Sequence, residues 1–145
     1  KAYAKTREAI DYEIPMSGKV FVSVCDRDKR SIAPVALSLT NLGYDLVATR
    51  GTAKTLRAAG IPCEVVRPIS EGSPNVLDMM AAGEVAFIVN TPRGGSSRGD
   101  GAKIRSEAVN RGVDMATTMS GATALIQAIA ALRKGPLDVY ALQNL

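Results

Sequence analysis

VFVSV at residues 20–24 and YDLVAT at residues 44–49 are the stretches that decide the fold. Both are short, largely apolar runs of the kind that form buried strands. Between them, apolar residues recur at helical spacing from Ile32 to Leu42 and stop at Gly43, a residue suited to the end of a helix. The order strand, helix, strand predicts a parallel sheet, because neighbouring parallel strands need a crossover connection.

The rest of the chain continues this alternation. We expect strands at residues 63–66, 85–90 and 113–116, with residues 139–142 as a candidate extra edge strand. Helices are expected at residues 52–59, after the N-cap pair Ser73-Pro74, at residues 102–111 capped by Asp100, and at residues 121–132. The predicted fold is therefore α/β: three α/β/α layers around a five-stranded, mainly parallel, doubly wound sheet.

Composition fits one soluble globular domain. The chain has 145 residues, of which 46% are hydrophobic and 22% charged, and its formal net charge is +4. Basic and aromatic residues are not interleaved, and the longest apolar stretch is too short to span a bilayer, so we expect neither a nucleic-acid nor a membrane partner. Cys25 and Cys63 lie in apolar surroundings and are expected to be reduced thiols of a cytoplasmic protein.

The first residues differ in character from the rest. Residues 1–11 form a polar, helix-like segment, and IPMSG at residues 14–18 leads into the first strand. We expect residues 1–17 to be a linker from an upstream domain, and residues 18–145 to form the domain itself.

Polar side chains follow the predicted strands at their carboxyl ends, where doubly wound sheets bind ligands. Those of interest are Ser23, Lys29, Thr49, Thr52, Arg67, Asn90 and Thr117. Thr49 and Thr52 flank Gly51, which allows close backbone approach where a helix begins and its dipole favours an anion. A threonine here also serves as a plain helix cap. The pairing with Ser23 and Lys29 favours a two-part phosphate cradle.

Residues 91–101 are rich in glycine, serine and arginine, and two interpretations of them stay open. They are either a solvated connector or a flap in which Arg93 and Arg98 attract an anion. The chain has no histidine, only two distant cysteines and no clustered carboxylates, so we expect no metal site. Without a histidine base we also expect no histidine-dependent hydrolase chemistry.

Several ordered blocks carry a family resemblance, at residues 18–24, 28–29, 48–53, 59–62, 70–75, 87–91, 103–105 and 116–118. In order and spacing they resemble the methylglyoxal-synthase-like domain at the C-terminus of the carbamoyl phosphate synthetase large subunit. The resemblance implies a regulatory domain, itself non-catalytic, that binds a nucleotide monophosphate such as UMP or IMP and modulates carbamoyl phosphate synthesis for the pyrimidine and arginine pathways.

The resemblance also implies site residues and partners. The family's phosphate and ribose contacts fall on Ser23, Lys29, Thr49, Thr52 and Asn90. A family lysine is replaced by Pro68 and a family threonine by Pro92, and we expect Arg67 to supply the missing charge. The implied partners are the remainder of the large subunit, which would use ATP and Mg²⁺, and its glutaminase small subunit, with a homo-oligomer as a further candidate.

Two enzymes with related sequences are the alternatives. Methylglyoxal synthase acts on dihydroxyacetone phosphate, but two of its aspartate positions are Ser73 and Thr91 here. The cyclohydrolase half of a bifunctional purine-synthesis enzyme shares a block like Gly51–Lys54, but its downstream signature is missing.

Overall fold

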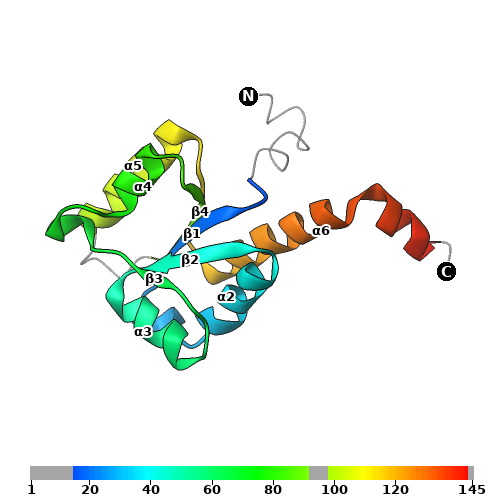
Figure 1. Cartoon of the computed structure of the whole chain (residues 1–145), viewed down its shortest axis with the longest axis horizontal. Helices are drawn as coiled ribbons and strands as arrows, with labels where there is room; N and C mark the ends of the chain where they lie inside the picture. Colours follow the sequence, from blue (N-terminus) through cyan, green and yellow to red (C-terminus); the bar gives the residue numbers. More distant parts are fainter. Residues whose placement is uncertain (1–14, 92–97, 144–145) are drawn as a thin grey trace.

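The computed structural model describes residues 15–91 and 98–143. Strands and helices alternate along them (Figure 1). The strands are β1 (Gly18–Ser23), β2 (Tyr44–Ala48), β3 (Glu64–Val65), β4 (Val85–Asn90) and β5 (Asp114–Ala116). The α-helices are α2 (Ile32–Asn41), α3 (Arg50–Ala58), α4 (Val76–Ala81), α5 (Arg98–Arg111) and α6 (Met119–Gln143), and the short 3₁₀ helices are η1 (Asp26–Asp28) and η2 (Ile69–Glu71).

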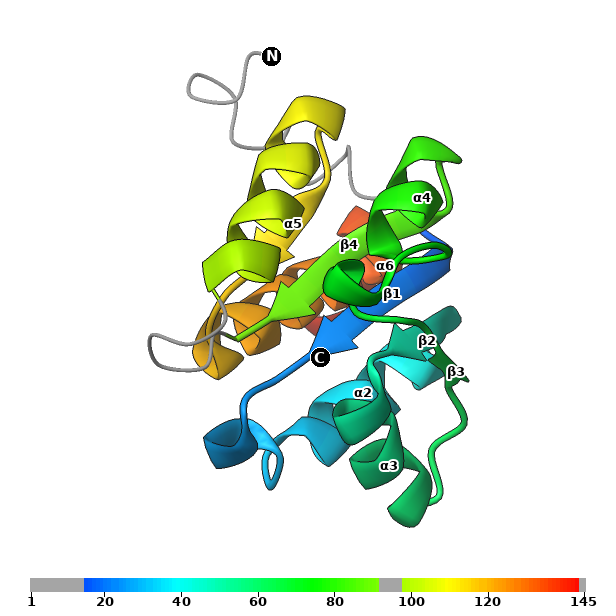
Figure 2. The same ribbon diagram turned by 90° about the vertical axis from the view of Figure 1, so that its left-hand side faces the viewer.

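The strands form one sheet in the order β3-β2-β1-β4-β5, and every pair is parallel. Helices cover both faces, with α4 and α5 on one side and α2 and α3 on the other (Figure 2). The predicted three-layer α/β/α fold with a five-stranded doubly wound sheet is thereby confirmed. The strand order reverses between β1 and β4, and such a switch point opens a crevice outside the carboxyl ends of the strands.

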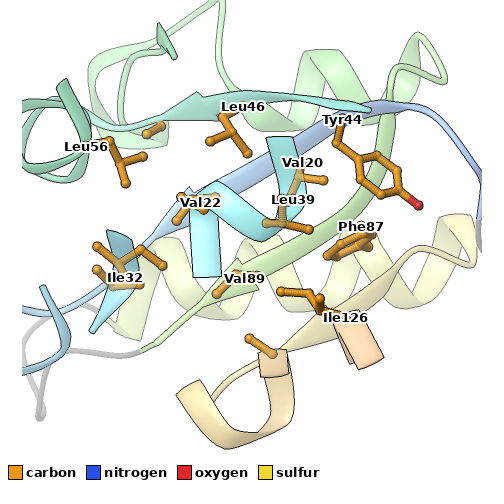
Figure 3. Packing of buried hydrophobic residues seen from close by; sticks show 14 of the residues in the cluster. Val20, Val22, Ile32, Leu39, Tyr44, Leu46, Leu56, Phe87, Val89 and Ile126 are labelled. Carbon is orange, nitrogen blue, oxygen red and sulfur yellow. The ribbon is translucent and has the colours of Figure 1, made fainter. Parts of the chain in front are cut away.

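The alternating pleat of the strands builds two cores. Val20, Val22 and Val89 pack with Ile32 and other residues of α2, α3 and α6 on one face (Figure 3). Their strand neighbours pack with α4 and α5 on the opposite face; these neighbours include Phe21, Val47 and Ile88. Because both faces are buried, the central strands read as continuous apolar runs in the sequence.

Helix α4 begins two residues later than predicted. Its N-cap is Asn75, whose side chain accepts a hydrogen bond from the Leu77 N–H at 2.8 Å, while the Asp78 carboxylate accepts one from the Asn75 N–H at 2.9 Å. This reciprocal capping box satisfies two backbone donors at once. The predicted N-cap at Ser73 is therefore wrong, and the Ser73-Pro74 bond is cis.

The predicted edge strand at residues 139–142 is also wrong. Helix α6 runs from Met119 to Gln143, through Gly135 and Pro136, and its red end turns away from its orange part (Figure 1). The fixed φ of proline is a helical value, so a proline inside a helix produces a bend rather than an obligatory end. Asp100 likewise lies within the first turn of α5, which starts at Arg98, and is not its N-cap.

The segment just before β1 is held against the domain. The Tyr44 hydroxyl donates to the Pro15 carbonyl at 2.6 Å, and Arg133 of α6 donates to the carbonyls of Met16 and Leu42. The Arg133 guanidinium also lies 5.4 Å from the centroid of the Tyr44 ring, a cation–π distance. Of the predicted linker at residues 1–17, residues 1–14 lie outside the described part of the chain. None of the described helices is both long and apolar enough to cross a membrane.

Candidate functional site

The carboxyl edge of the sheet carries a row of polar side chains. Ser23 alternates with Val22 and Val24, which lie in the core under α2, α3 and α6, so it belongs to the opposite face of the sheet. Asn90 is its register partner on β4. The same alternation assigns Thr49 after β2 and Thr117 after β5 to this face. Four predicted site residues therefore follow one another across the edge, from β2 to β5.

Thr49 occupies the N-cap position of α3, but its side chain makes no capping hydrogen bond. Its hydroxyl lies 3.3 Å from the Ser23 hydroxyl instead. Two hydroxyls from neighbouring strand ends therefore meet in front of α3. Thr49 therefore does not act as a side-chain cap of α3, because its hydroxyl contacts Ser23 and not a helix N–H. The first N–H groups of a helix have no intrahelical acceptor, which leaves them for a ligand or solvent.

Thr52, in the first turn of α3, joins the helix to β1. Its side chain is 2% exposed, and its hydroxyl accepts a hydrogen bond from the Val24 N–H at 3.1 Å. A hydroxyl that accepts one hydrogen bond still has its own proton to donate. Thr52 thus fixes the distance between the end of β1 and the start of α3, where the other polar groups gather.

A pocket of about 190 Å³ opens at this place. It is lined by residues from the ends of β1 and β2, the loop before α2, the first turn of α3 and the segment after β3: Ser23, Val24, Lys29, Thr49, Arg50, Gly51, Thr52 and Pro68. The structure thus brings four sequence-predicted residues into one cavity: Ser23, Lys29, Thr49 and Thr52.

Lys29 lies over the start of α3. A Cβ atom built on Gly51 would stand 3.3 Å from the Lys29 Nζ, so the glycine leaves the room that the ammonium occupies. The same Nζ lies 2.6 Å from Asp26 Oδ1. The Asp26 side chain is 95% exposed, whereas that of Lys29 is 22% exposed. The ammonium is therefore held at the pocket by a carboxylate that faces solvent.

Arg50 lines the pocket as well, although the sequence analysis did not assign it a role. Its Nη2 atom lies 2.5 Å from Glu71 Oε2, and this ion pair connects α3 to η2. The signal that could have identified Arg50 was its position inside the Thr49–Thr52 motif, at the first residue of the helix. Pro68, one residue before η2, contributes apolar surface to the same pocket.

A small cluster of hydrogen-bonded polar groups, from Cys25, Asp28 and Thr91, holds the loop that follows β1. The Thr91 hydroxyl accepts a hydrogen bond from the Cys25 N–H at 3.0 Å, and the Cys25 thiol donates to Asp28 Oδ2 at 3.2 Å. The thiol hydrogen bond is the largest of the effects that lower the pKa of Asp28 below its ordinary value of 3.8. Cys25 and Thr91 are both buried, so this cluster orders the backbone that leads to Lys29.

Other predicted residues lie apart from the pocket lining. Arg67 is exposed, and its Nη1 donates to the Ser73 carbonyl at 3.0 Å. Asn90 and Thr117 are half-buried further along the carboxyl edge. Arg98 begins α5, but its side chain and the whole of Arg93 lie outside the described residues.

The donors at this pocket suit a tetrahedral anion. Hydroxyl groups, helix N–H groups and the Lys29 ammonium all present hydrogens, and charge-assisted hydrogen bonds such as those of an ammonium are the strong ones. Within residues 15–91 and 98–143, no three His, Cys, Asp or Glu side chains are grouped so that they could hold a metal ion.

A family model for the MGS-like domain matches residues 31–117. Similar curated proteins include the carbamoyl phosphate synthase large chain, C-terminal section, of Methanopyrus kandleri, 46% identical over 99% of this chain and 27% of that protein. The corresponding section from Methanocaldococcus jannaschii is 44% identical over 100% of this chain and 24% of its own length. The carbamoyl phosphate synthase large chain of Xanthomonas axonopodis pv. citri is 42% identical over 99% of this chain and 13% of its own length. The chain thus spans about a quarter or less of the length of these relatives.

Solved structures share the fold. Methylglyoxal synthase from Elizabethkingia anophelis NUHP1 aligns with a TM-score of 0.63 and 16% identity, over 78% of this chain and 79% of that one. A structure titled ForH aligns with a TM-score of 0.53 and 21% identity, over 77% of this chain and 78% of that one. At such identities the likeness concerns the fold alone.

Proposed function

The chain belongs to the family of MGS-like domains, and from that premise we propose that it is the regulatory module of a carbamoyl phosphate synthase large chain, with a nucleoside monophosphate as its effector. Its relatives at 40–46% identity, each matched over nearly the whole of this chain, are carbamoyl phosphate synthase large chains, and two of them are C-terminal sections of that chain. The module itself performs no chemistry in this proposal. ATP and Mg²⁺ would serve the synthetic reaction in the remainder of the enzyme, beside its glutaminase subunit.

One observation carries the binding part of the proposal: the pocket in front of α3. Ser23 and Thr49 hydroxyls lie 3.3 Å apart there, and the Lys29 ammonium packs against Gly51 in the first turn of the helix. A phosphate at this position would receive hydrogen bonds from the hydroxyls and the helix N–H groups, and a charge-assisted one from Lys29. The helix dipole adds to the attraction.

The remaining polar edge suits the nucleoside. Asn90 is the register partner of Ser23, and Thr117 follows the strand next to β4. A ribose and base attached to a phosphate in the pocket would extend along this edge toward the β1/β4 switch point, where doubly wound sheets open their crevice. An amide side chain can both donate to and accept from a sugar or base.

Calorimetric titration of the chain with UMP and IMP tests the proposal. We expect binding of at least one of them, and much weaker binding of uridine or inosine, which lack the phosphate. Lys29→Ala should weaken the nucleotide by about 1.5–3 kcal/mol, because it removes a charge-assisted hydrogen bond. The matched control is Lys54→Ala, an exposed lysine of α3 outside the pocket lining.

Two results would count against this function. Turnover of dihydroxyacetone phosphate without nucleotide binding would identify the chain as a lyase. Equal affinity for nucleotide in Lys29→Ala and Lys54→Ala would move the phosphate away from the pocket.

The regulatory part needs the whole enzyme. An effector changes a rate or an affinity elsewhere only if it binds two states of the protein with different affinity. We expect the bound nucleotide to change carbamoyl phosphate synthesis by the intact synthase, and Lys29→Ala in that enzyme to shift the response to higher nucleotide concentration. An unchanged rate at saturating nucleotide would contradict the regulatory role.

A further inference from the structure

Arg50 is a cation at the pocket that the phosphate site described so far does not use. It is the first residue of α3, where the helix dipole disfavours positive charge unless an anion lies nearby. The anion that lies nearby is Glu71, whose Oε2 is 2.5 Å from the Arg50 Nη2. Both side chains are well exposed, at 61% and 47%. Arg50 is thus a pocket-lining guanidinium with a solvent-facing carboxylate as its partner.

Lys29 repeats this arrangement on the other side of Gly51. Its ammonium also lies at the start of α3, and its partner carboxylate, Asp26, also faces solvent. The pocket therefore has two cations beside one helix N-terminus, each paired with an acidic side chain from a neighbouring 3₁₀ helix. Asp26 belongs to η1, which precedes α3 in the sequence, and Glu71 belongs to η2, which follows it.

We propose that Arg50 is a second cationic ligand of the effector's phosphate, and that Glu71 competes with the phosphate for it. The inference rests on the proposed function, because it assigns a ligand within the same site. A phosphate with two negative charges can replace both carboxylates and keep the two cations neutralised. The planar guanidinium suits this exchange, since its parallel N–H donors match the oxygen spacing of a phosphate.

Because the Arg50–Glu71 ion pair is exposed, replacing Glu71 by a phosphate as the partner of Arg50 costs little free energy. An ion pair in contact with water contributes little to stability, because solvent screens the charges and both long side chains lose freedom. The same guanidinium bound to a phosphate between α3, Ser23 and Lys29 makes charge-assisted hydrogen bonds in a partly enclosed pocket. Glu71 therefore lowers the affinity for the effector without abolishing it.

A double-mutant cycle tests the competition, with Arg50→Gln, Glu71→Gln and the double variant titrated with UMP, IMP and inorganic phosphate. We expect Arg50→Gln to weaken binding about tenfold, as for one charge-assisted hydrogen bond. Glu71→Gln should tighten it by up to about fivefold, the size of an exposed ion pair. In the double variant the gain from Glu71→Gln should disappear, because Glu71 acts through Arg50.

Matched controls remove one charge of the same sign from exposed residues outside the pocket lining. Lys54→Gln on α3 is the control for Arg50→Gln, and Asp45→Asn on β2 is the control for Glu71→Gln. Thermal unfolding of all variants checks that they fold alike, as expected for exposed side chains.

Each result separates this inference from the proposed function. If the wild type binds nucleotide and Arg50→Gln binds it as Lys54→Gln does, the Arg50 role is overturned and the effector site remains. A gain from Glu71→Gln that persists without Arg50 overturns the competition. Arg50-dependent binding of inorganic phosphate without nucleotide binding supports Arg50 and overturns the nucleotide function. No binding of either ligand overturns both.

Discussion

Thr52 and Lys29 line the same pocket but contribute to the molecule in different ways. The Thr52 hydroxyl is buried and accepts the Val24 N–H, so it is part of what holds β1 to α3. The Lys29 ammonium lies at the pocket surface, where it pairs with the exposed carboxylate of Asp26. Substitutions at the first residue should therefore change stability, and substitutions at the second should change binding.

Thr52→Val tests the structural half of this distinction. Valine keeps the shape of threonine but leaves the buried Val24 N–H without its acceptor, which should cost about 1–3 kcal/mol of unfolding free energy. Thr52→Ser retains the hydroxyl and should lose clearly less. Urea denaturation of the three proteins measures the difference. Equal midpoints for the valine and serine variants would show that the hydrogen bond contributes little.

Asp28 makes stability depend on pH in acid. Its pKa in the folded chain is lowered below 3.8, mainly by the thiol hydrogen bond from Cys25. The folded state therefore favours the ionised carboxylate, and this contribution is present above pH 3.8 and disappears as the pH falls through the lowered pKa. Asp28→Asn should be less stable than wild type at pH 7, with the gap closing as the pH falls below 3.8. Urea midpoints across this range check it, and a constant gap would contradict it.

Residue types at strand ends were readable from the sequence, but their partners were not. Ser23, Thr49 and Thr52 were predicted because parallel strands end at one edge, which is a property of the fold class. Arg50 was not assigned a role, because its ion-pair partner Glu71 belongs to η2, 21 residues further along the chain. Arg67 was predicted to supply charge to the site, which stays a prediction; its hydrogen bond to the Ser73 carbonyl is a contact that no spacing rule encodes.

At the scale of elements, the first turn of α3 is where backbone, glycine and lysine meet. Gly51 has no side chain, and a Cβ added there would stand 3.3 Å from the Lys29 Nζ, a tight contact that the ammonium relieves only by moving. Helix stability and ligand binding therefore make opposite demands on this position. A residue with a side chain would favour the helix, and glycine favours the cation.

Gly51→Ala should separate these two demands. Alanine should raise stability by up to about 1 kcal/mol, because it reduces the freedom of the unfolded chain. Its Cβ should shift the flexible end of Lys29 slightly and weaken phosphate or UMP binding by up to about tenfold, the limit set by losing one charge-assisted hydrogen bond. Gly101→Ala in α5, where an added Cβ meets no described atom within 4 Å, is the control. Calorimetry and thermal unfolding measure both effects, and unchanged affinity in Gly51→Ala would argue against a phosphate beside Lys29.

The boundaries of an element could be predicted where the pattern of apolar residues sets them. They could not be predicted where capping hydrogen bonds set them. The strands and α2 follow their apolar patterns closely. Helix α4 starts at Val76, with Asn75 as its N-cap, because a capping box with Asp78 satisfies more backbone donors than a serine before proline. Helix α6 passes Pro136 and removes the predicted edge strand, since a proline constrains a helix without necessarily ending it.

At the scale of the whole molecule, stability depends on cores on both faces of a central sheet. Phe87 of β4 is fully buried, and its ring meets the Tyr44 ring edge to face with 5.4 Å between the centroids. Aromatic pairs of this geometry add to the free energy of burial. The pocket lies at the carboxyl edge of the same strands, so its geometry depends on this packing.

Phe87→Ala should therefore destabilise the whole chain. A loss of about 3–5 kcal/mol is expected for removing a buried phenyl ring, a large share of the stability of a single domain. Val109→Ala, on a side chain that is 74% exposed, should change stability by less than about 0.5 kcal/mol. Chemical denaturation monitored by circular dichroism compares them. Similar midpoints for the two variants would contradict the assignment of Phe87 to the core.

The edges of the sheet have a consequence for how the chain behaves in concentrated solution. The outer strands are short, with two residues in β3 and three in β5. Unpaired strand edges are templates on which other chains aggregate, and short edges are one of the protections that natural sheets use. These two edges offer few backbone groups with which a second copy could pair. The longer strands β2, β1 and β4 lie between them, so the arrangement disfavours edge-to-edge aggregation.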